Sequence, residues 1–163
     1  MKESYPLEQL AMIKTRRLEE AERILKEKKE ALLKEREKEK KLEEERNQVF
    51  QHREAKMVQF REKLDGGTTS DKIEQMREYI KVVNEELKQK EKSLQDQKKV
   101  CKKAEEAVEE ARKEMVKKQH DVEKMKMHRK EWEKEIRLQE LHREGIENDE
   151  LGTAMHTSKK EKR

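Results

Sequence analysis

The feature that most constrains the fold of this chain is a run of ten consecutive heptads in its second half. Reading every seventh residue from Ile73 to Ile136, nine of ten positions are apolar, and six of the ten positions three residues further along are apolar too. A repeat sustained over this length indicates the seam of a left-handed coiled coil. The sequence therefore predicts a long helix over residues 70–145.

A second, less regular apolar stripe occupies the first third of the chain. Apolar residues recur at helical spacing from Leu7 to Leu64, which predicts a helix over residues 6–64. The stripe nearly fails between Lys34 and Gln48, where twelve of fifteen residues are charged, six of each sign. Pairs of opposite charge three or four residues apart stabilise such a helix, so we expect it to continue there with looser packing.

The concentrated turn residues of the chain lie between the two stripes. Gly66 and Gly67 can adopt the left-handed conformation that ends a helix, and Ser70 or Asp71 can cap the next one. These residues predict a turn over 65–70. Because so short a link makes the two helices antiparallel, opposed residues should have numbers that sum to about 137. The expected fold is all-α, a single long antiparallel two-helix coiled coil over residues 1–163.

Composition excludes a globular core. Half of the residues are charged, 30% are hydrophobic and 3% are aromatic. Such a chain is too poor in apolar residues to enclose a pocket, so we expect no enzymatic activity. The net charge is +4, of which the last five residues supply +3. The remainder is balanced, which argues against nucleic-acid binding, and residues 146–163 are expected to form a frayed basic tail.

The sequence also limits the compartment and the membrane contacts of the chain. The longest apolar run, from Leu10 to Ile13, is too short to span a bilayer or to act as a secretory signal. A single cysteine, Cys101, excludes an intramolecular disulfide and falls in the heptad seam, where a small core residue is expected. We therefore expect a protein of the reducing cytosol with no direct membrane insertion.

No cofactor or metal is expected. The five histidines include no pair three or four residues apart, the spacing that places two metal ligands on one helical face. The sequence from Gly66 to Ser70 lacks both the preceding strand and the lysine of a nucleotide-binding loop. A helical-hairpin turn explains these residues better.

Trp132 allows two interpretations. It is the only tryptophan, and the expected register places it where the first helix barely reaches. Exposed aromatic residues are often anchors for a binding partner. Alternatively, Trp132 packs over Tyr5 and Leu7 and closes the end of the coil.

Several segments resemble a known family. They are Tyr5-Pro6-Leu7-Glu8 with Ile13-Lys14 and Arg17-Leu18-Glu19-Glu20-Ala21-Glu22, then Asp65-Gly66-Gly67-Thr68-Thr69-Ser70-Asp71, Tyr79-Ile80-Lys81-Val82-Val83 and His128-Arg129-Lys130-Glu131-Trp132-Glu133-Lys134-Glu135. In this order they resemble the small stalk proteins of bacterial type III secretion, the YscO family, whose flagellar counterpart is FliJ. The similarity is greatest to chlamydial members.

The resemblance implies a non-enzymatic central-stalk protein, a virulence-associated component that binds the hexameric secretion ATPase and couples it to the export gate. Secretion chaperones, which it would escort, and a needle-length regulator are the other implied partners. The implied location is the bacterial cytoplasm, at the cytoplasmic face of the inner-membrane apparatus. We expect a monomer in isolation.

The resemblance also implies where partners bind. ATPase contacts would fall at the end that carries both termini, on Tyr5, Leu7, Leu10, Arg16, Arg17, Trp132, Ile136 and Leu138. Gate or chaperone contacts would fall near the turn, on Tyr79, Ile80, Val82 and Val83.

Two other classes of function fit a coiled coil. A structural or tethering protein would self-associate in parallel, whereas a hairpin would stay monomeric. A prefoldin-like chaperone would need exposed apolar residues at its tip, and Asp65 to Asp71 supply none.

Overall fold

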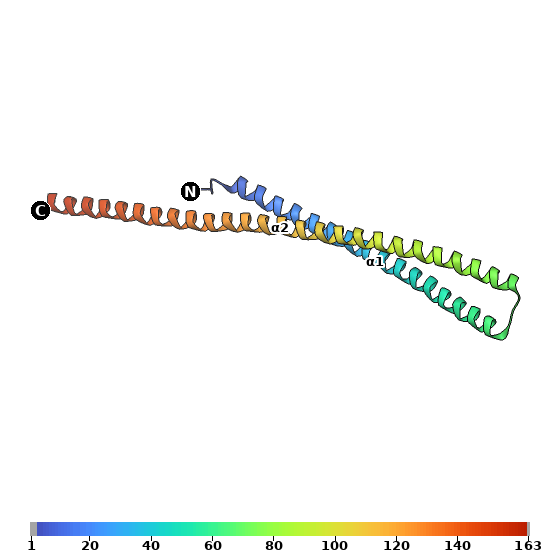
Figure 1. The fold of residues 1–163 in the computed structure, drawn as a ribbon. Helices are drawn as coiled ribbons and strands as arrows, with labels where there is room; N and C mark the ends of the chain where they lie inside the picture. The colour runs from blue at the N-terminus through green and yellow to red at the C-terminus, as the bar shows by residue number, and fades with distance from the viewer. Residues whose placement is uncertain (1–2, 163) are drawn as a thin grey trace. The chain divides into compact units, whose positions relative to one another are not determined.

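The computed structural model describes residues 3–162 and contains two helices (Figure 1). Helix α1 comprises Glu8–Gly66 (59 residues) and helix α2 comprises Ser70–Glu161 (92 residues). The described residues include no β-strand. This architecture confirms the prediction of an all-α helical hairpin.

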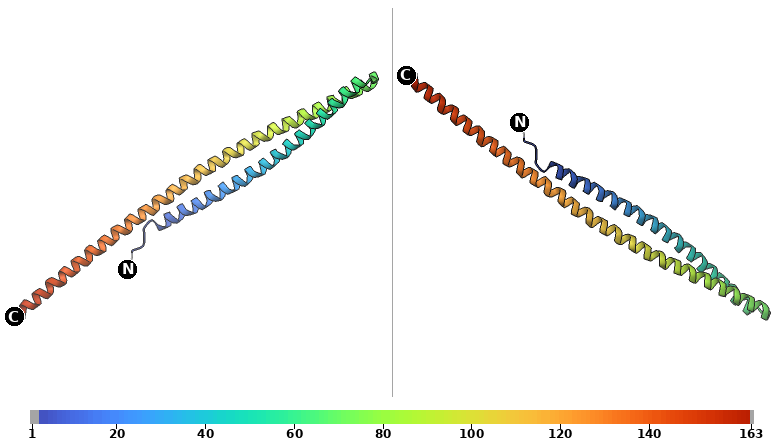
Figure 2. Two further views of the ribbon diagram at one scale, coloured as in Figure 1. Left: turned by 90° about the horizontal axis from the view of Figure 1, so that it is seen from below. Right: turned by 90° about the horizontal axis from the view of Figure 1, so that it is seen from above.

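The chain divides into two compact units. The terminal unit contains Met1–Glu22 and Glu114–Arg163, and the hairpin unit contains Arg23–Lys113. Within each unit a segment of α1 lies beside a segment of α2, as both views of Figure 2 show. Residues 1, 2 and 163, which the predicted domain included, lie outside the described residues.

The heptad positions of α2 form the seam. From Ile73 to Met125, every position of the predicted repeat is buried or half-buried. In the hairpin unit the most buried side chains of the seam come from both helices: Leu25, Leu32, Val83, Leu87, Leu94, Cys101, Val108 and Ala111. In the terminal unit they are Tyr5, Ala21 and Val122. The seam predicted from periodicity is confirmed in α2.

Contacts between the helices confirm the antiparallel register in both units. In the hairpin unit, Arg46 forms an ion pair with Glu91 at 3.1 Å, two residue numbers that sum to 137. In the terminal unit, Glu8 and Arg129 are 2.8 Å apart and their numbers also sum to 137.

The link between the helices is shorter than predicted. α1 ends at Gly66, and Gly67 has a φ of +83°, the left-handed conformation expected for glycine there. The Lys72 N–H donates a hydrogen bond to Thr69 Oγ1 at 3.4 Å, so Thr69 caps α2. The predicted cap at Ser70 or Asp71 is therefore wrong, because α2 already begins at Ser70.

The charged middle of α1 is continuous helix. Lys38 and Glu35 form the expected pair within the helix at 3.4 Å. Glu39 and Arg46 also occupy half-buried positions in this stretch. The aliphatic parts of such side chains can cover apolar neighbours on α2 while their charged ends reach solvent.

The predicted ends of the helices differ from the observed ones. α1 begins at Glu8 rather than residue 6, after a turn in which the Glu8 N–H donates to the Tyr5 carbonyl at 3.2 Å. α2 continues through Gly145 to Glu161, so the prediction of a frayed tail from residue 146 is wrong. A single helical glycine costs only about 1 kcal/mol relative to alanine, which weakens a helix without ending it.

Candidate functional site

The terminal unit contains a cluster of aromatic side chains at the point where α1 begins. Tyr5 precedes α1 yet is only 5% exposed. Its ring centroid lies 5.4 Å from that of Trp132 in an edge-to-face arrangement, and its hydroxyl oxygen is 2.5 Å from His128 Nδ1. Edge-to-face aromatic pairs are favourable beyond the area they bury. We call Tyr5, His128 and Trp132 the aromatic cluster.

Arg129 connects the aromatic cluster to the first turn of α1. Its guanidinium carbon lies 5.6 Å from the centroid of the Tyr5 ring, and its nitrogens form ion pairs with Glu8 at 2.8 Å and Glu133 at 3.2 Å. The hydrogen bond to Glu133 and the charge of Glu8 both raise the pKa of Arg129. Arg129 therefore stays cationic between two carboxylates and covers one side of Tyr5.

The cluster bears on the two interpretations of Trp132. Its indole is half-buried against Tyr5, as the second interpretation expects, and its role as an anchor for a partner stays a prediction. Leu7 remains 37% exposed. Helix spacing alone did not identify His128 and Arg129 as partners of Tyr5, although the antiparallel register places both residues opposite the start of α1.

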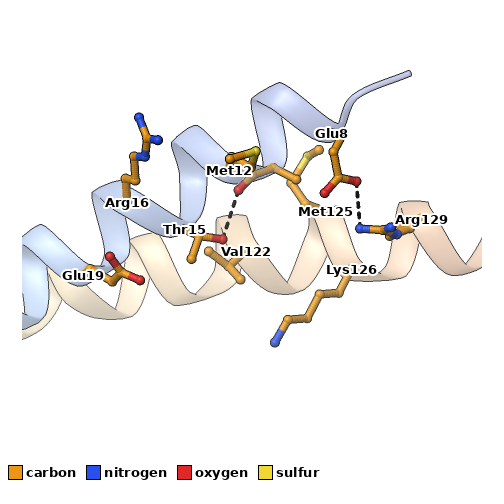
Figure 3. A pocket seen from close by; sticks show the side chains of 10 residues that line it. Glu8, Met12, Thr15, Arg16, Glu19, Val122, Met125, Lys126 and Arg129 are labelled. Carbon is orange, nitrogen blue, oxygen red and sulfur yellow. Dashed lines mark hydrogen bonds and ion pairs between the residues drawn. The ribbon is translucent and has the colours of Figure 1, made fainter. Parts of the chain in front are cut away.

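A groove of about 390 Å³ runs between the helices next to the cluster (Figure 3). Its walls include Met12 and Arg16 of α1 and Val122, Met125 and Lys126 of α2. Figure 3 shows the charged ends of Arg16 and Lys126 directed away from the space between the helices. The groove thus has an apolar floor and charged edges.

A second groove, of about 610 Å³, shares Glu8 and Arg129 with the first. Tyr5, Trp132 and Ile136 supply its apolar wall, and Glu3, Glu8, Glu133, Glu140, Arg129 and Arg137 supply charges of both signs. Neither groove contains the converging nucleophile, base or phosphate-binding loop that catalysis requires.

Beyond this groove α2 has no partner helix among the described residues. From Arg137 to Lys162 every residue is exposed. The large apolar side chains of this segment are 46–68% exposed: Leu138, Leu141, Ile146, Leu151 and Met155. We call residues 137–161 the exposed segment of α2. Sequence reasoning named only Leu138 as a contact residue: it missed Leu141, and it expected a frayed tail after Gly145.

The residues expected to contact the ATPase occupy different environments. Tyr5 is buried, and Trp132 and Ile136 are half-buried beside it. The others are exposed: Leu7, Leu10, Arg16, Arg17 and Leu138. Of these five, only Arg16 lines either groove, and Leu138 belongs to the exposed segment of α2.

The residues expected to contact the gate or chaperones lie in the hairpin unit. Val83 is 3% exposed and Ile80 is half-buried, since both are seam residues. Tyr79 and Val82 are 45% and 64% exposed. The Tyr79 hydroxyl is 2.7 Å from His52 Nε2, a contact that sequence reasoning missed.

Other candidate chemistry is limited in residues 3–162. No group of three or more His, Cys, Asp or Glu side chains is placed to hold a metal ion. Neither described helix offers an apolar stretch long enough to cross a membrane. Cys101 is buried, and burial together with Glu39 raises its pKa, which disfavours the reactive thiolate.

Comparison with known proteins identifies the family. The family model described as YscO-like protein matches residues 2–162. A solved structure of a proposed YscO homologue, CT670 from Chlamydia trachomatis, is 40% identical, covers 99% of this chain and 100% of its own, and superposes with a TM-score of 0.93. No curated protein sequence matches the chain. The family match over nearly the whole length and the agreement in fold show that this chain belongs to the YscO-like family.

Proposed function

We propose that this protein is a non-enzymatic stalk component of a type III secretion system that binds the secretion ATPase through its terminal unit and couples it to the export gate. Membership of the YscO-like family associates it with type III secretion. The ATPase, the gate and the direction of coupling are the parts that we propose.

One observation carries the proposal: α2 continues well beyond the last residue that α1 covers. The aromatic cluster ends the two-helix packing, and the exposed segment then presents five large apolar side chains to solvent. Such residues on a helix without an internal partner are typical of a protein-binding surface. A single helix of this length can enter the central opening of a ring that a broader domain could not.

The start of α1 extends this surface. Leu7 and Leu10 are 37% and 40% exposed, and Arg16 and Arg17 are exposed on the following turns. Arginine forms bidentate pairs with carboxylates and is frequent at protein interfaces. We therefore assign the apolar contacts with the ATPase to the exposed segment and the charged contacts to these arginines.

The hairpin unit supplies the second contact. Tyr79 and Val82 are exposed on α2 near the link, while Ile80 and Val83 hold that part of α2 in the seam. We assign the contact with the export gate, and with secretion chaperones in transit, to Tyr79 and Val82. The needle-length regulator is a further partner in this proposal, and the site of action is the cytoplasmic face of the inner membrane.

The experiment that tests the proposal measures ATP hydrolysis and hexamer assembly by the cognate secretion ATPase with and without this protein. We expect the protein to change both, and we expect Leu138→Ala to weaken the effect by about 1–2 kcal/mol of binding free energy, as for an interface anchor. Leu33→Ala is the matched control, because Leu33 and Leu138 are both 59% exposed leucines.

An unchanged hydrolysis rate together with unchanged assembly would exclude the ATPase as a partner. Equal losses from Leu33→Ala and Leu138→Ala would exclude the exposed segment as the binding surface. A parallel experiment compares Val82→Ala with Val58→Ala for binding to the gate protein, since both valines are at least half exposed.

A further inference from the structure

The apolar seam of the hairpin unit does not by itself choose one register. The seam positions of α2 recur with the heptad and are mostly apolar, so sliding α1 by one heptad again places its seam residues against apolar residues of α2 over much of the unit. The polar residues in the middle of the unit do not repeat in this way. Their contacts can therefore distinguish the observed register from the shifted ones, which burial of apolar side chains cannot do.

Gln97 is the centre of these polar contacts. It occupies a half-buried seam position, and its Nε2 donates hydrogen bonds to the Glu35 carbonyl at 2.9 Å and to Glu35 Oε2 at 2.7 Å. A shift of one heptad would place Gln97 opposite Leu42 or Lys28. Neither side chain has a hydrogen-bond acceptor, so both shifted registers lose the bond to the carboxylate and leave at most the bond to a backbone carbonyl.

Two ion pairs between the helices, on adjacent residues of α2, oppose one of the two shifts. In that shift each α2 residue faces an α1 residue seven positions earlier in the chain. Glu91 pairs with Arg46 at 3.1 Å, and Lys90 pairs with Glu45 at 3.1 Å. In the shifted register Glu91 would face Glu39, and Lys90 would face Lys38. Both contacts would change from attraction to repulsion.

A third ion pair opposes the shift in the other direction. Glu105 pairs with Arg36 at 3.0 Å. With each α2 residue facing an α1 residue seven positions higher, Glu105 would face Glu43. Glu91 would then face Arg53 and stay matched, whereas Lys90 would face His52 and lose its carboxylate partner. Gln97, Glu105 and Lys90 are therefore the residues that disfavour this register.

We propose that these contacts fix the heptad register of the two helices in the hairpin unit. The set consists of the Gln97–Glu35 hydrogen bonds and the ion pairs of Glu91, Lys90 and Glu105, and we call it the register cluster. The charged stretch of α1 thus has less apolar packing than the rest of the seam, but its polar contacts prevent the two helices from sliding.

The short link between the helices also resists sliding. When one helix slides by seven residues, the midpoint of the turn must move three to four residues along the chain, into residues that are now helical. A flexible glycine-serine insertion between Gly67 and Thr68 removes this resistance. The register is then decided by the helices, and the full-length chain with this insertion is the parent for the test.

Cross-linking reports the register. In a Cys101→Ala background, His52→Cys is combined with Tyr79→Cys for the observed register, because these side chains are in contact. His52→Cys with Lys72→Cys or with Glu86→Cys reports a shift of one heptad in either direction, about 10 Å along the helix. A short bis-maleimide then traps whichever pair is close.

The register-cluster variant changes only α2: Lys90→Gln, Glu91→Gln, Gln97→Leu and Glu105→Gln. The control variant neutralises an equal number of charges in pairs within α2 that carry no information about register: Glu109→Gln, Arg112→Gln and Glu114→Gln. Helical content by circular dichroism accompanies each measurement.

With the cluster intact, and in the control, we expect the observed pair to cross-link almost alone. In the register-cluster variant we expect the ratio of shifted to observed cross-links to rise roughly tenfold, since several small contact energies are lost together. Equal ratios in the cluster and control variants would overturn the proposal. Loss of every cross-link in the cluster variant would also overturn the proposal. The residues would then be needed for the two helices to associate at all, and not for the choice of register.

Discussion

Tyr5 is buried although it precedes the first helix, because side chains of α2 cover it. Trp132 packs against its ring edge-to-face, His128 lies within hydrogen-bond distance of its hydroxyl, and Arg129 covers a third side. The residue thus attaches the start of the chain to α2 without belonging to either helix. Its side chain is the most specific contact in the terminal unit.

Substitution of Tyr5 separates the parts of this contact. Tyr5→Phe keeps the ring and loses the hydroxyl, so we expect a loss of about 0.5–1.5 kcal/mol in the stability of the terminal unit. Tyr5→Ala also removes the ring, with an expected loss of about 3 kcal/mol and exposure of Trp132. The fluorescence of Trp132 during urea unfolding measures both changes. An unaltered emission spectrum in Tyr5→Ala would contradict the described packing.

Glu35 provides a pH test of the register cluster. The hydrogen bond from Gln97 is the main cause that lowers the pKa of Glu35 below its ordinary value of 4.5, and Lys38 lowers it further. A carboxyl with a lowered pKa stabilises the fold above its unfolded pKa, and this contribution is lost as the pH falls through the folded value. The loss therefore occurs below pH 4.5.

We expect Gln97→Leu to raise the pKa of Glu35 toward the ordinary value and to reduce the loss of stability below pH 4.5. Lys38→Gln should also raise the pKa, because the charge of Lys38 and its hydrogen bond both lower it. An NMR titration of the Glu35 side chain measures the shifts. An unchanged pKa of Glu35 in Gln97→Leu would contradict the assigned hydrogen bond.

At the residue scale the sequence predicted seam positions better than contacts outside the seam. The heptad repeat identified Val83 and Leu87 as buried because burial depends on spacing, which is visible in one chain. The hydrogen-bonding partner of Tyr5 depends on the rotation of both helices, which the spacing of one stripe does not set. Trp132 was correctly placed near Tyr5 only because the register rule brought α2 back to the start of α1.

At the scale of elements, the link shows which glycine is structural. Gly67 has a left-handed φ of +83°, whereas Gly66 is the last residue of α1, and a Cβ at either position would meet no atom within 4 Å. We expect Gly67→Ala to destabilise the hairpin by about 1 kcal/mol through backbone strain. Gly66→Ala is the control and should be neutral or slightly stabilising. Equal unfolding midpoints in urea would contradict this difference.

The cap of α2 gives a second prediction at this scale. Thr69 accepts the Lys72 N–H, so Thr69→Ala should cost about 1 kcal/mol. Ser70→Ala removes a hydroxyl from the residue that the sequence favoured as a cap and should change stability little. Each variant removes one hydroxyl at adjacent positions, and thermal unfolding distinguishes them.

The ends of the helices were the least predictable part of the fold. A glycine at position 145 and the thinning of apolar residues after it favoured an end to α2, but neither supplies the turn that stops a helix. Gly67 does stop one, because it adopts the left-handed conformation and a second helix follows. Whether a glycine ends a helix therefore depends on its φ, which composition does not reveal.

At the scale of the whole molecule, pairing within one chain predicts a monomer. The seam residues of α2 already have partners on α1 in both units, so a second copy would find no free seam there. We expect the mass in solution to be that of one 19.8 kDa chain, measured by sedimentation equilibrium across a range of concentrations. A stable dimer would favour the tethering alternative. Because the net charge is only +4, this result should depend little on salt.

The exposed segment of α2 has a consequence for how this family changes over time. No described residue beyond Ile136 is buried, so folding places almost no restriction on which side chains occur there. A position in that segment that stays the same among relatives is therefore retained for a partner rather than for the fold. Where two lineages differ at several positions of the segment, we expect them to differ in what they bind. Exchanging their segments should then exchange their partners while leaving both hairpins folded.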